Sequence, residues 1–163
     1  MLRLVYFPSP GRAEAIRVAL SLSGSEWEDS TIDGKRFQAM KEEGELPWGM
    51  VPVLQTPDGT IAESSAILRF VGRLAGLVPE DPYQCAKADE FIDGMEPLSK
   101  ALDSTFRIAS VDERIRLRKE VFGPSGKGTR NLIRLEGKVT ESETGWAAGT
   151  DEMSIADLKL FTG

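Results

Sequence analysis

The stretch from Leu46 to Arg73 most constrains the fold, because it contains a proline at the start of a short apolar strand. Proline cannot donate a hydrogen bond to a sheet, so the Val51–Pro52 step predicts a bend, for which a cis bond is the commonest reason. A turn, a second short strand and an amphipathic helix starting at Ser64 are expected to follow, in that order. A bend that turns the Val51 backbone outward, beside free N–H groups of a helix start, predicts a site for a small acidic peptide.

The rest of the first half predicts the order strand, helix, strand, helix, strand, strand, helix. The first strand, helix, second strand, turn and brief second helix are expected at residues 2–7, 12–23, 27–32, 33–34 and 37–41. Strand–helix–strand units need a crossover connection and therefore a partly parallel sheet. We expect an α/β domain of the thioredoxin-like type over residues 1–76.

The second half changes character after a linker at residues 77–82 and predicts helices only. Apolar side chains recur at helical spacing from Phe91 to Leu102, and Pro97 inside this span predicts a kink. Ser154 and Asp157 form an S-x-x-D cap at a helix start, close to the last residue of the sequence. The helical domain at residues 83–163 is therefore expected to be truncated.

Composition excludes several classes of function. The net charge of −6 argues against nucleic-acid binding, which relies on lysine and arginine. The absence of histidine excludes imidazole chemistry, and the single cysteine, Cys85, excludes an internal disulfide and favours a reducing compartment. No apolar run is long enough to predict a membrane span, so a cytoplasmic protein without a membrane partner is expected.

Residues 46–73, together with residues 4–17 (LVYFPSPGRAEAIR), resemble the glutathione-binding domain of the cytosolic glutathione transferases. The tyrosine-type branch, sigma-like classes above all, is most similar, and the sequence GRAE at residues 11–14 matches it. The SIAD sequence at residues 154–157 resembles a helix start in the second domain of this family. The resemblance implies a transferase that activates glutathione as a thiolate, either for conjugation to a small hydrophobic electrophile or for isomerisation. It also implies a homodimer, with glutathione as co-substrate and no metal.

By this resemblance Tyr6 is the catalytic residue that hydrogen-bonds the glutathione sulfur, and Arg12 lies near it and supports that bond. A free thiol has a pKa of about 8.5, and lowering it by ~2 units corresponds to roughly 2.7 kcal/mol. Charge-assisted hydrogen bonds can supply this energy. Ser9 is the rival thiol activator, because other branches use a serine in this loop. The structural alternatives are a core tyrosine, a loop serine and a surface arginine.

The resemblance also assigns the glutathione contacts by position. The Val51 backbone pairs with the cysteine of glutathione, and Pro52 holds the bend. Ser64 binds the γ-glutamyl carboxylate and Glu63 meets the α-amino group, although Ser64 alone would be interpreted as a helix cap. Lys41 reaches the glycine carboxylate, while the position of Phe37 usually carries tryptophan in this branch. The complete predicted binding set is Tyr6, Phe37, Lys41, Met50, Val51, Pro52, Glu63 and Ser64.

Other features leave alternatives open. The sequence GPSGKGT at residues 123–129 is similar to a phosphate-binding loop but lacks its first glycine and does not follow a strand, so it predicts a linker between helices. Glu96 either reaches a partner subunit's glutathione or is a solvated charge. Trp48 is either an exposed interface residue or a buried anchor, and Cys85 is expected to be a small buried residue.

Two other classes of function compete with the enzyme. A non-catalytic protein on the same scaffold would bind glutathione or serve assembly, as lens crystallins and accessory domains of translation factors in this family do. The 163-residue chain is alternatively an inactive fragment, whose second domain has an unfilled core.

Overall fold

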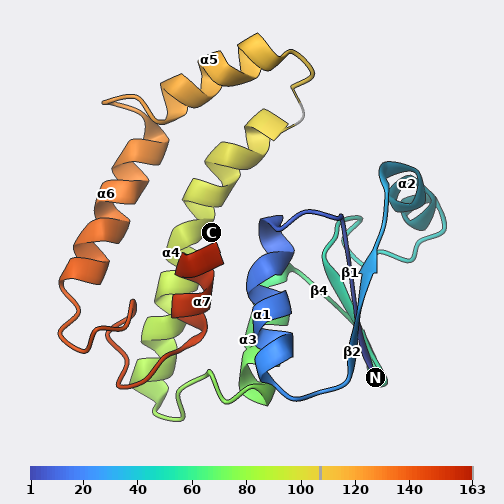
Figure 1. Cartoon of the computed structure of the whole chain (residues 1–163), viewed down its shortest axis with the longest axis horizontal. Coiled ribbons are helices and arrows are strands. Elements are labelled where there is room, and N and C mark those ends of the chain that lie inside the picture. Colours follow the sequence, from blue (N-terminus) through green and yellow to red (C-terminus); the bar gives the residue numbers. More distant parts are fainter. Residues whose placement is uncertain (107, 163) are drawn as a thin grey trace.

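The first part of the molecule is a four-stranded sheet with helices on both of its faces (Figure 1). The computed structural model describes residues 1–106 and 108–162. The strands are β1 (Leu2–Tyr6), β2 (Trp27–Thr31), β3 (Val53–Thr56) and β4 (Gly59–Ala62), and the helices are η1 (Gly11–Ala13), α1 (Glu14–Leu22), α2 (Gly34–Glu42) and α3 (Ser64–Leu74). The strand order is β2-β1-β3-β4, with β1 parallel to β2 and the other pairs antiparallel. The predicted thioredoxin-like fold is confirmed.

Strand β1 is buried on both faces of this sheet. Successive side chains of a strand point to opposite faces. Leu4 is fully buried in a cluster with Ile16 of α1 and Ile67 of α3. Val5 is buried in a second cluster on the other face, with Met40 of α2. Core clusters therefore cover both faces of the sheet at β1, and the end of this strand at Tyr6 is left to form part of a site.

The second part consists of helices, as predicted (Figure 1). They are α4 (Pro82–Phe106), α5 (Val111–Val121), α6 (Lys127–Thr140) and α7 (Ile155–Thr162). Helix α4 contacts α5, α6 and α7, and α7 also contacts α1. The cluster that contains Leu4 continues into this part through Phe91 and Ile155. A single hydrophobic core contains residues of both parts. The predicted boundaries of the two domains, at residues 76 and 83, therefore stay a prediction.

The predicted cap at the start of α7 is confirmed. The Asp157 carboxylate accepts hydrogen bonds from the Ser154 backbone N–H at 2.8 Å and from the Ser154 hydroxyl at 3.2 Å. Its other oxygen accepts from the backbone N–H of Ala147 at 2.7 Å. The Ile155 N–H donates to the Leu77 carbonyl at 2.9 Å. The short helix α7 is thus tied at its first turn to two separate segments.

Two local predictions need correction. Asp33-Gly34 is not a free turn, and the second helix does not begin at Phe37. Helix α2 begins at Gly34, because the Asp33 side chain accepts a hydrogen bond from the Arg36 N–H at 2.7 Å and caps it. Cys85 is half-buried rather than buried. Helix α4 continues through Pro97, where the expected kink stays a prediction. In the described residues, no helix combines the length and apolar character needed to cross a membrane.

Candidate functional site

Three chain segments that carry predicted site residues meet at one end of the sheet. Val5 of β1 lies opposite Val53 of β3, and Val53 lies opposite Ala62 of β4. Tyr6 directly follows Val5 in the sequence, Pro52 directly precedes Val53, and Glu63 directly follows Ala62. The register therefore places residues from three distant parts of the sequence along a single edge. The end of β2 leads from the same edge into α2.

Tyr6 is held by the loop that follows it. Its hydroxyl oxygen accepts a hydrogen bond from the Arg12 backbone N–H at 3.3 Å. Gly11, at φ +44°, lets the loop approach this closely, since an added Cβ would stand 2.8 Å from the Tyr6 hydroxyl oxygen. In the described part of the chain, no acceptor receives the Tyr6 proton. The phenol thus has a free proton to donate, and its oxygen is polarised by a backbone N–H.

The Arg12 guanidinium points to α4 rather than to the phenol. It bonds Asp103 at 2.6 Å and Glu96 at 3.2 Å. Burial by itself would lower the pKa of Arg12, but the hydrogen bonds and charges of the two carboxylates raise it above its ordinary value. Glu96 is consequently neither freely solvated nor unpaired within this chain. The contact of Arg12 with Tyr6 comes from its backbone, and its predicted catalytic role stays a prediction.

Arg17 lies beside the Tyr6 ring, a contact that the sequence did not reveal. Its guanidinium carbon lies 5.9 Å from the centroid of the Tyr6 ring, within the range of a cation–π contact. The same side chain bonds Asp29 at 2.9 Å, Glu14 at 3.0 Å and the Ser9 carbonyl at 2.9 Å. The i,i+3 spacing of Glu14 and Arg17 was the one available signal. Ser9 itself is exposed in the loop.

The backbone around Val51 is open, as the sequence predicted. The Val51–Pro52 bond is cis, and the pairing of β1 with β3 ends at Val5–Val53. Within residues 1–106 and 108–162, the Val51 backbone makes no hydrogen bond, although its side chain is buried. Met50 beside it is 48% exposed. An unpaired N–H and C=O next to a sheet end can hold an extended peptide.

Glu63 has an unusual backbone conformation at the start of α3. Its φ is +69°, the one positive value at a non-glycine residue in the described chain. Such conformations cost energy and are concentrated at functional sites. The Glu63 side chain is exposed, and the adjacent Ser64 is buried at the first turn of the helix. Neither side chain has a hydrogen-bond partner in the described residues.

A chain of aromatic rings connects Tyr6 to α2. The Tyr6 and Phe7 centroids lie 5.5 Å apart, and those of Phe7 and Phe37 lie 5.4 Å apart, both edge-to-face. The Lys41 amine lies 5.6 Å from the Phe37 centroid. Phe37 and Lys41 are therefore neighbours on one helix face. Trp48, in the loop after this helix, is 73% exposed.

Similarity to known proteins agrees with this arrangement. The model of the family described as Glutathione S-transferase, N-terminal domain, matches residues 2–73. A Glutathione S-transferase P of Bos taurus is 35% identical over 95 residues, 58% of this chain and 45% of that protein. The solved structure of the sigma class glutathione S-transferase of Fasciola hepatica is 29% identical, with a TM-score of 0.81 over 99% of this chain and 76% of that one. Residues 2–73 are therefore a glutathione S-transferase N-terminal domain.

A second solved glutathione S-transferase extends the likeness through the helices. The monomeric Na-GST-3 of the hookworm Necator americanus is 29% identical, with a TM-score of 0.82 over 98% of this chain and 77% of that one. The chain spans about half the length of the curated glutathione S-transferases P that it matches. Within the described residues, no group of three or more metal-binding side chains is found. The predicted sigma-like resemblance is confirmed.

Proposed function

We propose that this protein binds glutathione at the sheet end and activates its thiol through Tyr6. The observation that carries the proposal is the Tyr6 hydroxyl, which accepts a hydrogen bond from the Arg12 N–H and has no acceptor of its own in the described chain. A sulfur anion beside it would receive the phenol proton as a charge-assisted hydrogen bond. The reaction supported best is conjugation of the thiolate to a small hydrophobic electrophile, with glutathione-dependent isomerisation as its variant.

The rest of the tripeptide would be bound along the edge described above. The Val51 backbone N–H and C=O are available to pair with the peptide groups of glutathione, and Met50 and Pro52 flank them. The N–H groups at the start of α3, with the Ser64 hydroxyl, suit the γ-glutamyl carboxylate. Glu63 suits its α-amino group, because its carboxylate is exposed and unpaired in the described residues.

The glycine carboxylate of glutathione, at the other end of the tripeptide from the γ-glutamyl group, requires a cation. Lys41 of α2 would supply it. The Phe37 ring beneath Lys41 gives the peptide an apolar wall. Activation in this site would come from hydrogen bonding and from placing thiol and electrophile side by side. Loss of the hydrogen bond that Tyr6 donates should cost about 1.5–3 kcal/mol, which is roughly a 10- to 100-fold loss of rate.

The decisive experiment is Tyr6→Phe, assayed by thiolate absorbance of bound glutathione and by conjugation rate with a general electrophile. We expect both to fall while glutathione binding is retained. Tyr83→Phe is the matched control, because Tyr83 is the only other tyrosine of the sequence and is 73% exposed on α4. If Tyr6→Phe leaves both readouts unchanged and Ser9→Ala abolishes them, Ser9 is the thiol activator instead.

A homodimer in the cytoplasm is a further part of the proposal, and the exposed loop after α2 supports the dimer. Trp48 is 73% exposed and Met50 is 48% exposed, so two large apolar side chains lie together on one loop. Sedimentation of the full chain should report a dimer whose dissociation constant rises in Trp48→Ala. A monomer at all concentrations would contradict this part and would leave the Tyr6 proposal standing.

A further inference from the structure

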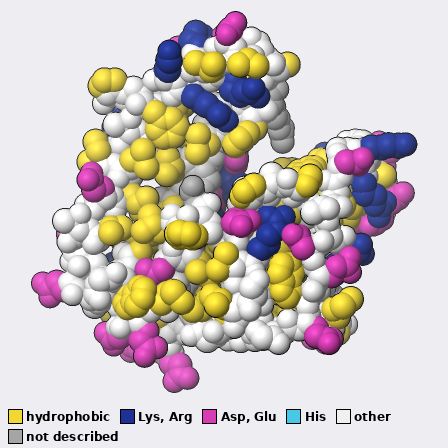
Figure 2. Space-filling view, viewed as in Figure 1, with side chains coloured by type: hydrophobic (Ala, Val, Ile, Leu, Met, Phe, Trp, Pro, Cys, Tyr) yellow, Lys and Arg dark blue, Asp and Glu magenta, His cyan; other side chains and the backbone are white. Residues whose placement is uncertain are grey.

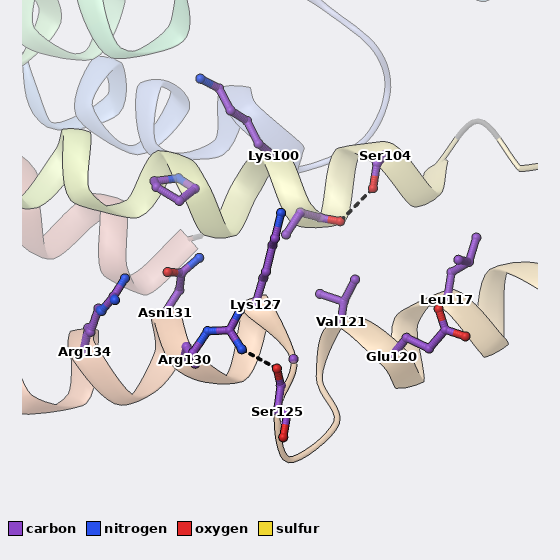
Figure 3. Close-up of a pocket in the computed structure, with 13 residues that line it drawn as sticks. Lys100, Ser104, Leu117, Glu120, Val121, Ser125, Lys127, Arg130, Asn131 and Arg134 are labelled. Atoms are coloured by element: carbon purple, nitrogen blue, oxygen red, sulfur yellow. Dashed lines mark hydrogen bonds between the residues drawn. The ribbon is translucent and has the colours of Figure 1, made fainter.

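A cavity of about 890 Å³ lies between α4, α5 and α6, outside the proposed glutathione site (Figure 3). Three basic side chains of α6 line it, namely Lys127, Arg130 and Arg134, and Lys100 of α4 is the fourth cation. Its volume falls within the range of about 300–1,000 Å³ that is typical of small-molecule sites. The walls also contain the Asn131 amide, so the cavity offers hydrogen-bond donors as well as positive charge.

The positive charge at this cavity runs against the composition of the whole chain. Residues 111–140 contain eight lysines and arginines against four acids, although the chain has a net charge of −6. Figure 2 shows lysine and arginine side chains gathered over α5, the helix next to the cavity. Lys100, Lys127 and Arg134 form no ion pair within the described residues. The one acid of the lining, Glu120, is paired with Arg116 of its own helix.

The spacing of the α6 cations favours a ligand with more than one anionic group. Lys127, Arg130 and Arg134 follow each other at i, i+3 and i+7, which puts them on one helix face about 5–6 Å apart. Like charges at this spacing repel each other. Arg130 is oriented by a hydrogen bond to the Ser125 carbonyl, drawn in Figure 3. Each guanidinium can donate hydrogen bonds to two oxygens of one phosphate or carboxylate.

We propose that this cavity binds a small ligand that carries two or more phosphate or carboxylate groups. A nucleic-acid strand is disfavoured, because no aromatic side chain lines the cavity and base stacking would have no partner. The glycines of the adjacent GPSGKGT loop serve packing rather than ligand binding. A Cβ at Gly126 would overlap the Val121 carbonyl, and one at Gly128 would stand 2.7 Å from the Phe122 ring.

The test is calorimetric titration of the full chain with tripolyphosphate and, separately, with citrate, at low and at physiological ionic strength. We expect saturable binding of at least one probe, weakened by salt. Comparison of the two probes tells phosphate from carboxylate recognition. In Lys127→Gln/Arg134→Gln the dissociation constant should rise about 10-fold or more, because two charge-assisted contacts are lost.

The matched control is Arg114→Gln/Lys119→Gln, which removes the same charges from α5 outside the cavity lining. It should change the dissociation constant less than about two-fold, as distant charges are screened. Thermal unfolding of both variants checks that they remain folded, and Arg134→Gln alone repeats the test with the smallest change. Absence of saturable binding, equal weakening in the control, or tighter binding of a polynucleotide than of either probe would overturn the proposal.

Discussion

The sheet unit, formed by β1–β4 with α1–α3, and the α5–α6 hairpin at residues 111–140 use their side chains in opposite ways. Leu4, Ile16, Leu54 and Ile67 of the sheet unit are fully buried. Helix α5 contains no buried residue, and in α6 only Gly128 is buried. The sheet unit thus fixes the predicted glutathione residues through its core. The hairpin places Lys127 and Arg134, which form no ion pair with any described residue, on a surface that packing constrains little. The two candidate sites should therefore respond differently to mutation.

The largest difference is expected for truncation of an aliphatic side chain. Leu54→Ala in β3 removes a fully buried side chain and leaves a cavity, which should cost about 2–5 kcal/mol of unfolding free energy. Ile133→Ala in α6, where Ile133 is 60% exposed, should change stability by less than about 0.5 kcal/mol. Urea denaturation of both variants measures the contrast. Equal losses would mean that the hairpin is packed as firmly as the sheet.

Replacing glycine by alanine should change the stability of the protein in opposite directions in the two regions. A Cβ at Gly72 of α3 would overlap Ile155 of α7, whose branched and fully buried side chain cannot move aside. Gly72→Ala should therefore destabilise the protein by about 1–3 kcal/mol. Gly137 of α6 has no atom within 4 Å of its Cβ position, so Gly137→Ala should stabilise by about 0.4–1 kcal/mol. Thermal unfolding reports both, and a loss at Gly137 would contradict the prediction of a loosely packed hairpin.

The contrast also explains what the sequence could and could not reveal. The fold and the positions of Tyr6, Val51 and Ser64 were predictable from local patterns. Strand alternation, a proline step and a helix start each depend only on residues close together in the sequence. The partners of Arg12 were not predictable, since Glu96 and Asp103 are 84 and 91 residues away in the sequence. Arg17 over the Tyr6 ring was missed for a related reason, because that contact depends on how α1 packs against β1.

The α6 cations illustrate a different limit of sequence reasoning. Their spacing at i, i+3 and i+7 was visible in the sequence, but it reads as an ordinary solvated helix face. Only the packing of α4 against α6 shows that they line a cavity with Lys100. The GPSGKGT sequence predicts a linker between helices, yet its Lys127 is the first residue of α6 and lines the cavity.

Removal of a helix cap should give a smaller difference in stability between α7 and α5. Asp157 accepts two hydrogen bonds from Ser154 and one from Ala147, so Asp157→Ala should cost about 1–2 kcal/mol. Ser110 accepts one long hydrogen bond of 3.3 Å from the Glu113 N–H at the start of α5. Ser110→Ala should therefore cost only about 0.5 kcal/mol. Chemical denaturation distinguishes the two, and a larger loss at Ser110 would show that the hairpin depends on its cap.

The last contrast concerns two lysines and the pH dependence of stability. Lys159 of α7 is 6% exposed, and burial lowers its pKa, although Glu96 and Asp103 attract the charged amine. Because the folded pKa lies below the unfolded value of about 10.4, the unfolded chain binds more protons between these values, and stability rises with pH across that window. The cost of burying the charge is complete below the folded pKa and absent above the unfolded one.

Lys159→Met should consequently stabilise the protein at neutral pH by about 1 kcal/mol, because an apolar side chain of similar size avoids this desolvation. The gain should shrink as the pH approaches about 10.4, where the native lysine is also neutral. Lys119→Met, exposed on α5, should show no such pH dependence. Denaturation midpoints across the alkaline range measure the effect. If Lys159→Met destabilises at neutral pH instead, the amine is held by Glu96 and Asp103, and α7 is joined to the Arg12 contacts by charge rather than by burial alone.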